Sequence, residues 1–582
     1  MESLYNQDPS MWLFQISRFA AGQMPYRDFS WNYPPLAIFL LGSIARWFGA
    51  TFAVVQIAMD LISLAVVFLC VWLVRYLLEA STRFVTVAAV IAVCATSFTK
   101  FNLFSFSTYS PALEIAAAAL LMLLIGGLRQ LERGDASPGN LLLLCAGVFV
   151  ATVSKPEAAV AAWGAVVLLR VLDKSAKWRW YLLLVAGAGI PAAAFYAFVG
   201  ITAGFPQLKA GLGGYGLASF ACPWWPTGYG VFGMVAETGE AAFVAAVLLW
   251  LVRSRLEPRC RSVLGRLSIC GCTGLLIFVS YVWYQSGYVL LSSAPGSVKL
   301  ETLARAVVWT NGALLPVMWA SIFVWIGFVF SFRKLGGASP RLCFFLSVPV
   351  IMSGRGLFGT TLFPYTEVSA MCYPFFVIAA ACLLEALYRR ALPQGRVAST
   401  LVISILLGGY GAARLIGAYP AQLSDEPYYT LHTKAGDIRL SDDHVSERIY
   451  DYVLSHTHAG DMLLDVPYGG GFNFATGLPS PTFTTQFQQL RMSMSFQDRD
   501  LNNVLKTPPA LVVADPGPNF QAQFGYPGKM NCPFPRLVWE PTDSSWSPGY
   551  AFPVITYVAE HYHQVAEYGQ KVILAPNSPA IE

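Results

Sequence analysis

Long apolar stretches alternate with short polar ones from about residue 53 to about residue 420 of the chain. A helix needs about 20 mostly apolar residues to cross the hydrocarbon core of a bilayer. The pattern predicts spans near 53–75, 84–99, 110–128, 140–154, 157–172, 180–200, 241–253, 264–289, 306–332, 342–353, 368–388 and 398–418. The chain is therefore predicted to be a polytopic α-helical membrane protein with about 12 spans.

The apolar run 34–48 decides on which side of the membrane every later loop lies. Proline is favoured in the first turn of a helix, so we predict that Pro35 begins a helix here. If this helix lies along the membrane surface, the loops on one side carry 19 basic residues and those on the other carry 9. The side richer in Lys and Arg is the cytoplasmic one. Counting 34–48 as a span would break this asymmetry, so both the opening segment and the chain after the last span are predicted to be extracytoplasmic.

An extracytoplasmic start has a consequence for the N-terminus. The chain begins outside the membrane without a helix that would bring it there. We expect a first transmembrane helix to be encoded upstream of Met1, and unaided translocation of the N-terminus is the alternative.

The pattern changes near Ala421, where the long apolar runs stop and all 6 histidines appear. A helix-like period over 443–456 is followed by apolar runs typical of buried strands. Alternating helices and strands predict a small α/β domain. Three parts are thus expected: an outer loop with juxtamembrane helices over 1–52, a membrane domain over 53–420 and an extracytoplasmic α/β domain over 421–582.

Composition agrees with a membrane protein whose main partner is the lipid bilayer. Only 12% of the residues are charged and the mean hydropathy is +0.53, whereas soluble domains carry about 25% charged residues. Basic cytoplasmic loops account for the net charge of +5, so it implies no nucleic acid partner. Of the 11 cysteines, only Cys222 and Cys532 fall in outer segments, where one disulfide is conceivable.

Several kinds of site are not expected. The membrane region contains no histidine, which makes a zinc site there unfavourable, and no metal ligands are predicted. Neither a GxxxxGK[ST] phosphate loop nor a GxSxG nucleophile elbow occurs. The pairs His456/His458 and His561/His563 are interpreted as surface histidines.

The stretch GQMPYRDFSWNYPP (22–35) is the first candidate for chemistry, because it places Asp28 between aromatic residues in an outer loop. A plain ion pair between Asp28 and Arg27 is an equally weighted alternative.

Two further outer loops carry ionisable groups close to the membrane. SKPEA (154–158) contains Lys155 and Glu157, and ionisable groups at membrane depth usually line a cavity or a partner site. SGRGLFGTTLFPYTE (353–367) contains Arg355, whose guanidinium suits phosphate oxygens, and Glu367. The alternatives are a loop with snorkelling ends in the first case and interfacial anchoring in the second.

The residues around Asp28 resemble a known family. The pattern G-x-x-P-Y-R-D-F-x-W-N-Y-P-P-L, followed by the interfacial run and W-F-G, looks like the first extracytoplasmic loop of the GT-C superfamily. These polytopic membrane glycosyltransferases use lipid-phosphate sugars and include the protein O-mannosyltransferases and the lipid A aminoarabinose transferases. K-P-E at 155–157 resembles a short basic motif in many bacterial members, and 471–482 is similar to part of their C-terminal domain.

The resemblance implies a role for each candidate. Asp28 matches the essential acid and would act as general base, and Asp8 is a poorer match to a second acid. Lys155 and Arg355 would contact the donor phosphate, and Arg27 would orient that phosphate or tune Asp28. The remaining candidates, predicted to contact substrate, are Trp31, Tyr33, Glu157 and Glu367.

The implied reaction moves a sugar from a polyprenyl phosphate to a glycan, lipid or protein acceptor, by one displacement with inversion. No cofactor is required by this reading, although a divalent cation is compatible with it. The expected location is the cell membrane, in the inner membrane of a bacterium. The rival hypothesis is a transporter or flippase that moves lipid-linked sugars without chemistry.

Overall fold

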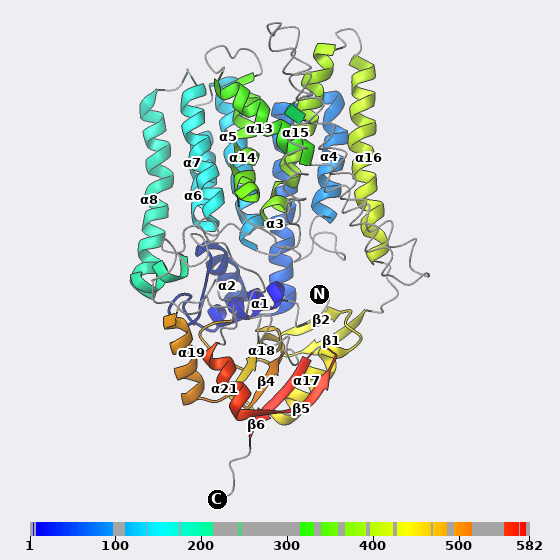
Figure 1. Cartoon of the computed structure of the whole chain (residues 1–582). Coiled ribbons are helices and arrows are strands. Elements are labelled where there is room, and N and C mark those ends of the chain that lie inside the picture. Colours follow the sequence, from blue (N-terminus) through cyan, green and yellow to red (C-terminus); the bar gives the residue numbers. More distant parts are fainter. Residues whose placement is uncertain are drawn as a thin grey trace, which may run out of the picture.

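A computed structural model describes most of the predicted spans, most of the segment 1–52 and a large part of the segment 421–582 (Figure 1). The described residues are 4, 7–96, 111–134, 137–173, 175, 177–212, 244–245, 315–330, 339–358, 367–391, 396–422, 428–466, 469–485, 494–514, 552–569 and 571–577. The predicted spans 241–253 and 264–289 fall almost entirely outside these ranges.

The membrane domain is a bundle of long helices that stand side by side (Figure 1). Each described helix coincides with a predicted span: α3 (Phe52–Leu77), α4 (Ala80–Thr96), α5 (Pro111–Arg133), α6 (Pro138–Ser154), α7 (Pro156–Leu172), α8 (Trp178–Ala203), α13 (Leu315–Phe330), α14 (Ser339–Phe358), α15 (Glu367–Ala391) and α16 (Arg396–Gln422). Among the described residues, α3, α5 and α8 are both long and apolar enough to cross a membrane. These features are those of a multi-pass membrane protein.

Helix α5 forms the centre of the bundle. Within its most apolar window 83% of the residues are buried, compared with 33% in α3 and 22% in α8. Close packing requires a small residue where α6 crosses α5, because a Cβ on Gly147 would lie 2.8 Å from the carbonyl oxygen of Ala119. The outer helices therefore present their remaining apolar faces to lipid.

Two shorter helices, α1 (Gln7–Ala20) and α2 (Leu36–Phe48), lie at one end of the bundle (Figure 1). Helix α2 follows Pro35 as expected and has 13 residues. A helix of that length is about 20 Å long, whereas the hydrocarbon core is about 30 Å thick. The predicted interfacial position of this run fits its length.

The described residues of the C-terminal part, from Tyr429 onwards, form two sheets. A hairpin of β1 (Tyr429–Thr433) and β2 (Gly436–Leu440) is followed by a four-stranded sheet in the order β3-β4-β6-β5. In this sheet β3 (Leu463–Asp465) is parallel to β4 (Leu511–Ala514), whereas β6 (Lys571–Pro576) is antiparallel to β4 and to β5 (Tyr562–Tyr568). The described helices of this part are α17 (Val445–His456), α18 (Gly471–Thr476), α19 (Met494–Lys506) and α21 (Pro553–His561).

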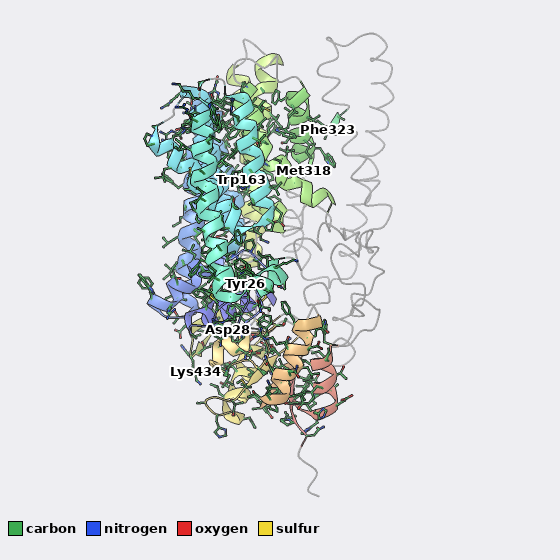
Figure 2. All side chains as sticks on the ribbon, turned by 90° about the vertical axis from the view of Figure 1, so that its left-hand side faces the viewer. Tyr26, Asp28, Trp163, Met318, Phe323 and Lys434 are labelled. Carbon is green, nitrogen blue, oxygen red and sulfur yellow. The ribbon has the colours of Figure 1, made fainter. Side chains whose placement is uncertain are left out.

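This C-terminal part docks directly on the N-terminal helices and on the start of the bundle. The backbone N–H of Phe52 donates to the carbonyl of Ala435 at 3.0 Å, and the N–H of Leu4 donates to Ser446 Oγ at 2.9 Å. Gly471 permits the close approach of α18, because a Cβ there would lie 1.8 Å from the carbonyl oxygen of Leu4. Figure 2 shows Tyr26 and Asp28 between the helices that carry Trp163 and the hairpin that carries Lys434.

Two helix ends meet the loop 22–35 at this end of the bundle. They are the junction of α6 and α7 at Lys155 and the end of α8 at Thr202. The start of α3 lies at the same end, where Phe52 contacts the hairpin turn. Because the helices alternate in direction, the basic residues that close α3, α5 and α7 lie at the opposite end. They are Arg75, Arg133 and Arg170. These three basic residues therefore lie at the end of the bundle away from Asp28.

Candidate active site

The loop that carries Asp28 is a tight turn closed by its own backbone. The N–H of Tyr26 donates to the carbonyl of Phe29 at 2.9 Å, and the N–H of Asp28 donates to the carbonyl of Met24 at 2.8 Å. Tyr26 has a φ of 68°, a left-handed conformation that costs a non-glycine residue roughly 1–2 kcal/mol. Its buried hydroxyl donates to the carbonyl of Tyr33 at 2.5 Å. The surrounding contacts therefore hold the turn in a conformation that the local chain would not favour.

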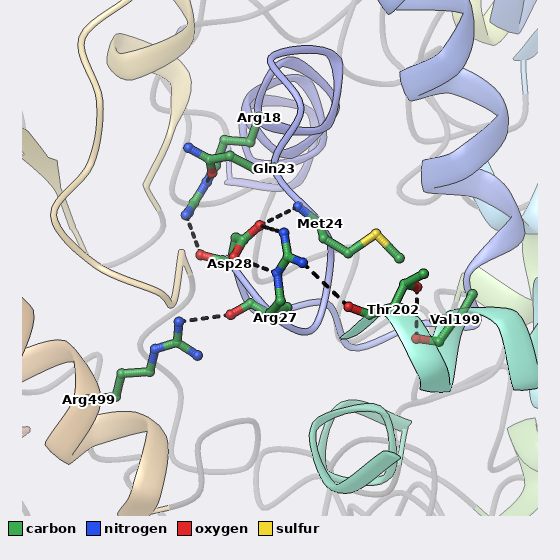
Figure 3. Close-up of polar contacts among 8 residues, drawn as sticks. All are labelled: Arg18, Gln23, Met24, Arg27, Asp28, Val199, Thr202 and Arg499. Carbon is green, nitrogen blue, oxygen red and sulfur yellow. Dashed lines mark hydrogen bonds and ion pairs between the residues drawn. The ribbon is translucent and has the colours of Figure 1, made fainter. Parts of the chain in front are cut away.

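The carboxylate of Asp28 is held by its own neighbour. Arg27 donates from Nε to Oδ1 at 3.0 Å and from Nη2 to Oδ2 at 2.8 Å (Figure 3). The backbone N–H of Met24 also donates to Oδ2, at 2.7 Å. The ion pair that was the alternative interpretation of Asp28 is therefore present. The turn at Tyr26 and Asp28 places the two adjacent side chains on the same side.

These contacts set the protonation state of Asp28. The hydrogen bond from Arg27 lowers the pKa of the Asp28 carboxyl below its usual value, and the Met24 N–H and the nearby Arg499 act in the same direction. The side chain keeps an exposed fraction of 33%. Asp28 is thus an ionised carboxylate at neutral pH that solvent and solutes can reach, so it can accept a proton.

Lys155 lies between α6 and α7 and is buried, with an exposed fraction of 1%. Its Nζ is 4.5 Å from the centre of the Tyr33 ring, a cation–π contact. Tyr33 stacks on Trp12 at 5.2 Å and meets Trp31 edge-on at 5.7 Å. Both predicted aromatic residues, Trp31 and Tyr33, are themselves buried. The aromatic cluster therefore joins the Asp28 loop to the lysine of the second predicted loop.

The remaining predicted residues lie at helix ends. Glu157 is half-buried in the first turn of α7, where the helix dipole favours a carboxylate. Glu367 is the first residue of α15. Arg355 was expected in a loop beginning at residue 353, and this boundary is wrong, because α14 continues to Phe358. Glycines are tolerated in membrane helices, where unpaired backbone groups are costly, so Gly354 and Gly356 do not end this one.

The structure also brings polar residues to Asp28 that the sequence interpretation missed. Arg18 of α1 donates from Nη2 to the carbonyl of Asp28 at 2.8 Å and from Nε to Gln23 Oε1 at 2.6 Å (Figure 3). Arg499 of α19 donates to the carbonyl of Arg27 at 2.8 Å, with its guanidinium carbon 4.1 Å from the Phe483 ring centre. A local signal existed for α1, because Gln15 and Arg18 are three residues apart and share one face of an amphipathic helix.

The described part of the chain holds no group of three or more His, Cys, Asp or Glu side chains that could bind a metal ion. All the histidines are exposed, as expected. Three of them pair with neighbouring carboxylates, namely His432 with Asp437, His444 with Glu447 and His458 with Asp461.

No protein-family model and no curated protein matches the chain. Among solved structures it is similar to ArnT from Cupriavidus metallidurans bound to undecaprenyl phosphate, with 14% identity over 98% of this chain and 94% of that one and a TM-score of 0.45. It is also similar to the apo oligosaccharyltransferase of Archaeoglobus fulgidus, with 10% identity over 88% and 66% of the two chains and a TM-score of 0.45.

A second structure from that archaeon, AglB in complex with an inhibitory peptide and a dolichol-phosphate, gives 12% identity over 88% and 65% of the chains and a TM-score of 0.40. At these values the similarity concerns the overall course of the chain and none of the side chains described above.

Proposed function

We propose that this chain is a membrane glycosyltransferase that moves a sugar from a polyprenyl-phosphate donor to an extracytoplasmic acceptor, with Asp28 as the general base. The observation that carries the proposal is the position of an ionised, one-third exposed carboxylate between the membrane helices and the C-terminal domain. The buried lysine of the same end of the bundle, Lys155, supports it.

The reaction is a single displacement at the anomeric carbon of the donor sugar. An acceptor hydroxyl or amine attacks this carbon and gives its proton to Asp28. The bond between the anomeric carbon and the phosphate oxygen breaks, and its electron pair leaves with the polyprenyl phosphate. The configuration at the anomeric carbon is inverted, because attack and departure occur on opposite faces.

Fixed cations stabilise the negative charge that grows on the departing phosphate. We assign this role to Lys155 and Arg355. For Arg27 the geometry favours tuning of Asp28, because the guanidinium forks onto the carboxylate. Glu157 and Glu367 flank the site at helix starts and are candidates for contacts with the polar acceptor or sugar.

The orientation in the membrane belongs to the same proposal. In the sequence, the loops assigned to the side opposite Asp28 carry more Lys and Arg, so that side would face the cytoplasm. Asp28 and the C-terminal domain then lie outside, as expected for the inner membrane of a bacterium. A transporter or flippase has no need for a carboxylate held at the contact with a folded domain, so the enzyme is the better-supported function.

The test compares Asp28→Asn with the matched control Asp437→Asn, which alters an exposed, ion-paired aspartate of the hairpin. Purified protein in lipid nanodiscs is given a panel of radiolabelled polyprenyl-phosphate sugars and a cell-envelope extract as acceptor. We expect Asp28→Asn to lower transfer by about 10²–10⁴-fold and Asp437→Asn to leave it unchanged. Sugar transfer by folded Asp28→Asn at the wild-type rate would refute the role of Asp28 as general base. If the wild type moved the lipid-linked sugar across the membrane without any sugar transfer, the flippase hypothesis would be favoured.

A further inference from the structure

The backbone around Asp28 is held from the C-terminal domain as well as from its own turn. The N–H of Ser30 donates to the carbonyl of Phe483 at 2.8 Å. Gln15 bridges the same two segments, because its Nε2 donates to the carbonyl of Ser30 at 3.0 Å and to Thr485 Oγ1 at 2.8 Å. The segment 482–485 therefore lies along the loop that carries the proposed base.

Arg18 is the residue that ties these pieces together. It is buried, with an exposed fraction of 9%, and it donates to the carbonyls of Asp28 at 2.8 Å and of Thr482 at 3.3 Å. Its guanidinium carbon lies 4.9 Å from the Phe29 ring centre. One side chain of α1 thus fixes both the backbone of Asp28 and the facing segment 482–485 of the C-terminal domain.

Asp500 supplies the opposite charge from α19. It is fully buried, and its Oδ1 accepts the backbone N–H groups of Phe483 at 2.5 Å and Thr484 at 3.2 Å. Burial lowers the pKa of Arg18 to about 10, and the charge of Asp500 is the largest effect opposing this. Asp500 therefore holds the segment 482–485 and, in its ionised form, also stabilises the buried cation that reaches Asp28.

We propose that Arg18 and Asp500 are positioning residues for Asp28, so that the C-terminal domain is part of the catalytic site. The inference rests on the proposed role of Asp28 as base. Neither side chain donates to or accepts from the Asp28 carboxylate in the described structure. Arg18 donates to the backbone carbonyl of Asp28, and Asp500 accepts the N–H of Phe483, whose carbonyl in turn accepts the N–H of Ser30. A base displaced by about 1 Å can lower the rate by about 10²-fold, so small errors in this backbone matter.

The first test separates positioning from general stability. Arg18→Lys keeps the charge but not the planar fork of donors, and Asp500→Asn keeps shape but not charge. With the donor that the wild type turns over, we expect kcat to fall by roughly 10–10²-fold in each. The KM for the donor should stay within about twofold, since Lys155 and the membrane helices are unchanged. The control is Asp173→Asn, a buried carboxylate that accepts the N–H of Ser175 at the far end of the bundle.

A double-mutant cycle gives the sharper result. If Arg18 acts through Asp28, Arg18→Lys should have no further effect on kcat in the Asp28→Asn background. Equal fold-losses in both backgrounds would overturn the inference. A second outcome would also overturn the positioning role. If Asp28→Asn lost transfer while Arg18→Lys and Asp500→Asn kept the wild-type kcat, the proposed function would stand and the positioning role would not.

A measurement that needs no substrate completes the test. Amide hydrogen exchange over residues 24–30 should become faster in Arg18→Lys and Asp500→Asn and stay unchanged in Asp173→Asn. Unchanged exchange in the first two variants would contradict the positioning role. Faster exchange together with full activity of Asp28→Asn would instead show that the loop is held as inferred and that the proposed base is wrong.

Discussion

Arg27 and Asp28 are neighbours in the chain, and the guanidinium of the first holds both carboxylate oxygens of the second, at 3.0 and 2.8 Å. This bidentate contact occupies the donors that would otherwise be available for a donor phosphate. It also makes the carboxylate a weaker base that stays ionised to lower pH. The geometry of the pair therefore favours one role for Arg27, which is to lower the pKa of Asp28, over the other, which is to bind the donor phosphate.

This relationship predicts a pH effect for Arg27→Gln. Loss of the guanidinium removes the largest cause of the low pKa of Asp28, so the pKa should rise. Because Asp28 must be ionised to act, the acidic limb of the kcat/KM profile should move to higher pH, with little change at neutral pH. An Arg448→Gln variant, which loses contacts with the backbone carbonyls of His444 and Asp443 just before α17, should keep the wild-type limb. A raised donor KM with an unmoved limb would instead mean that Arg27 binds the phosphate.

A second prediction concerns the stability of the protein rather than its rate. Burial raises the pKa of Asp500 from 3.8 to about 7. Between these values the folded protein holds the proton and the unfolded chain does not, so the free energy of unfolding should fall as the pH rises from about 4 to about 7. Above pH 7 this contribution should be constant. Asp500→Asn removes it, and thermal unfolding of wild type and variant across this range measures the difference. A Tm difference that is independent of pH would contradict the assignment.

The membrane helices could be predicted because an apolar run of about 20 residues is a local signal. The same holds for α17 and for the strands β3, β4 and β6, whose sequences are periodic or continuously apolar. Strand β5 has a mostly exposed and polar pattern, so no such signal marks it. The hairpin β1–β2 was also missed, although Gly436, with a φ of 92°, follows its turn.

The site divides in the same way. Asp28 and Lys155 could be named from short motifs, since the loop and the helix junction carry their own polar residues. Arg18 and Asp500 could not be paired from the sequence, because their proximity depends on the docking of α1 against the C-terminal domain. The burial of Trp31 and Tyr33 also depends on that docking and on the contact between Tyr33 and Lys155. Tertiary packing, and no local pattern, decides these positions.

The arrangement of helix ends predicts the orientation of the chain. A periplasmic reporter enzyme that is active only outside the cytoplasm should be active when fused after Glu582. It should be inactive when fused to a chain ending at Arg133, which lies at the basic end of α5. The reverse pattern would place Asp28 in the cytoplasm, where an acceptor of the cell envelope could not reach it.

Lys155 predicts a measurable contribution to binding of the lipid phosphate. A hydrogen bond to a charged group is worth about 1.5–3 kcal/mol, so Lys155→Ala should raise the Kd for undecaprenyl phosphate by roughly 10- to 150-fold. Undecaprenol, which has no phosphate, should bind wild type and variant alike.

The control for this measurement is Lys434→Ala, which removes an exposed lysine from the hairpin turn and should leave both affinities unchanged. Tyr33→Leu adds a second comparison, because it removes the ring beneath the ammonium without removing the charge. A cation–π contact contributes about 0.5–2 kcal/mol, so this variant should weaken binding less than Lys155→Ala. Equal affinity of wild type and Lys155→Ala for undecaprenyl phosphate would show that the buried lysine serves the aromatic cluster alone, and the phosphate would then have to be bound by other cations.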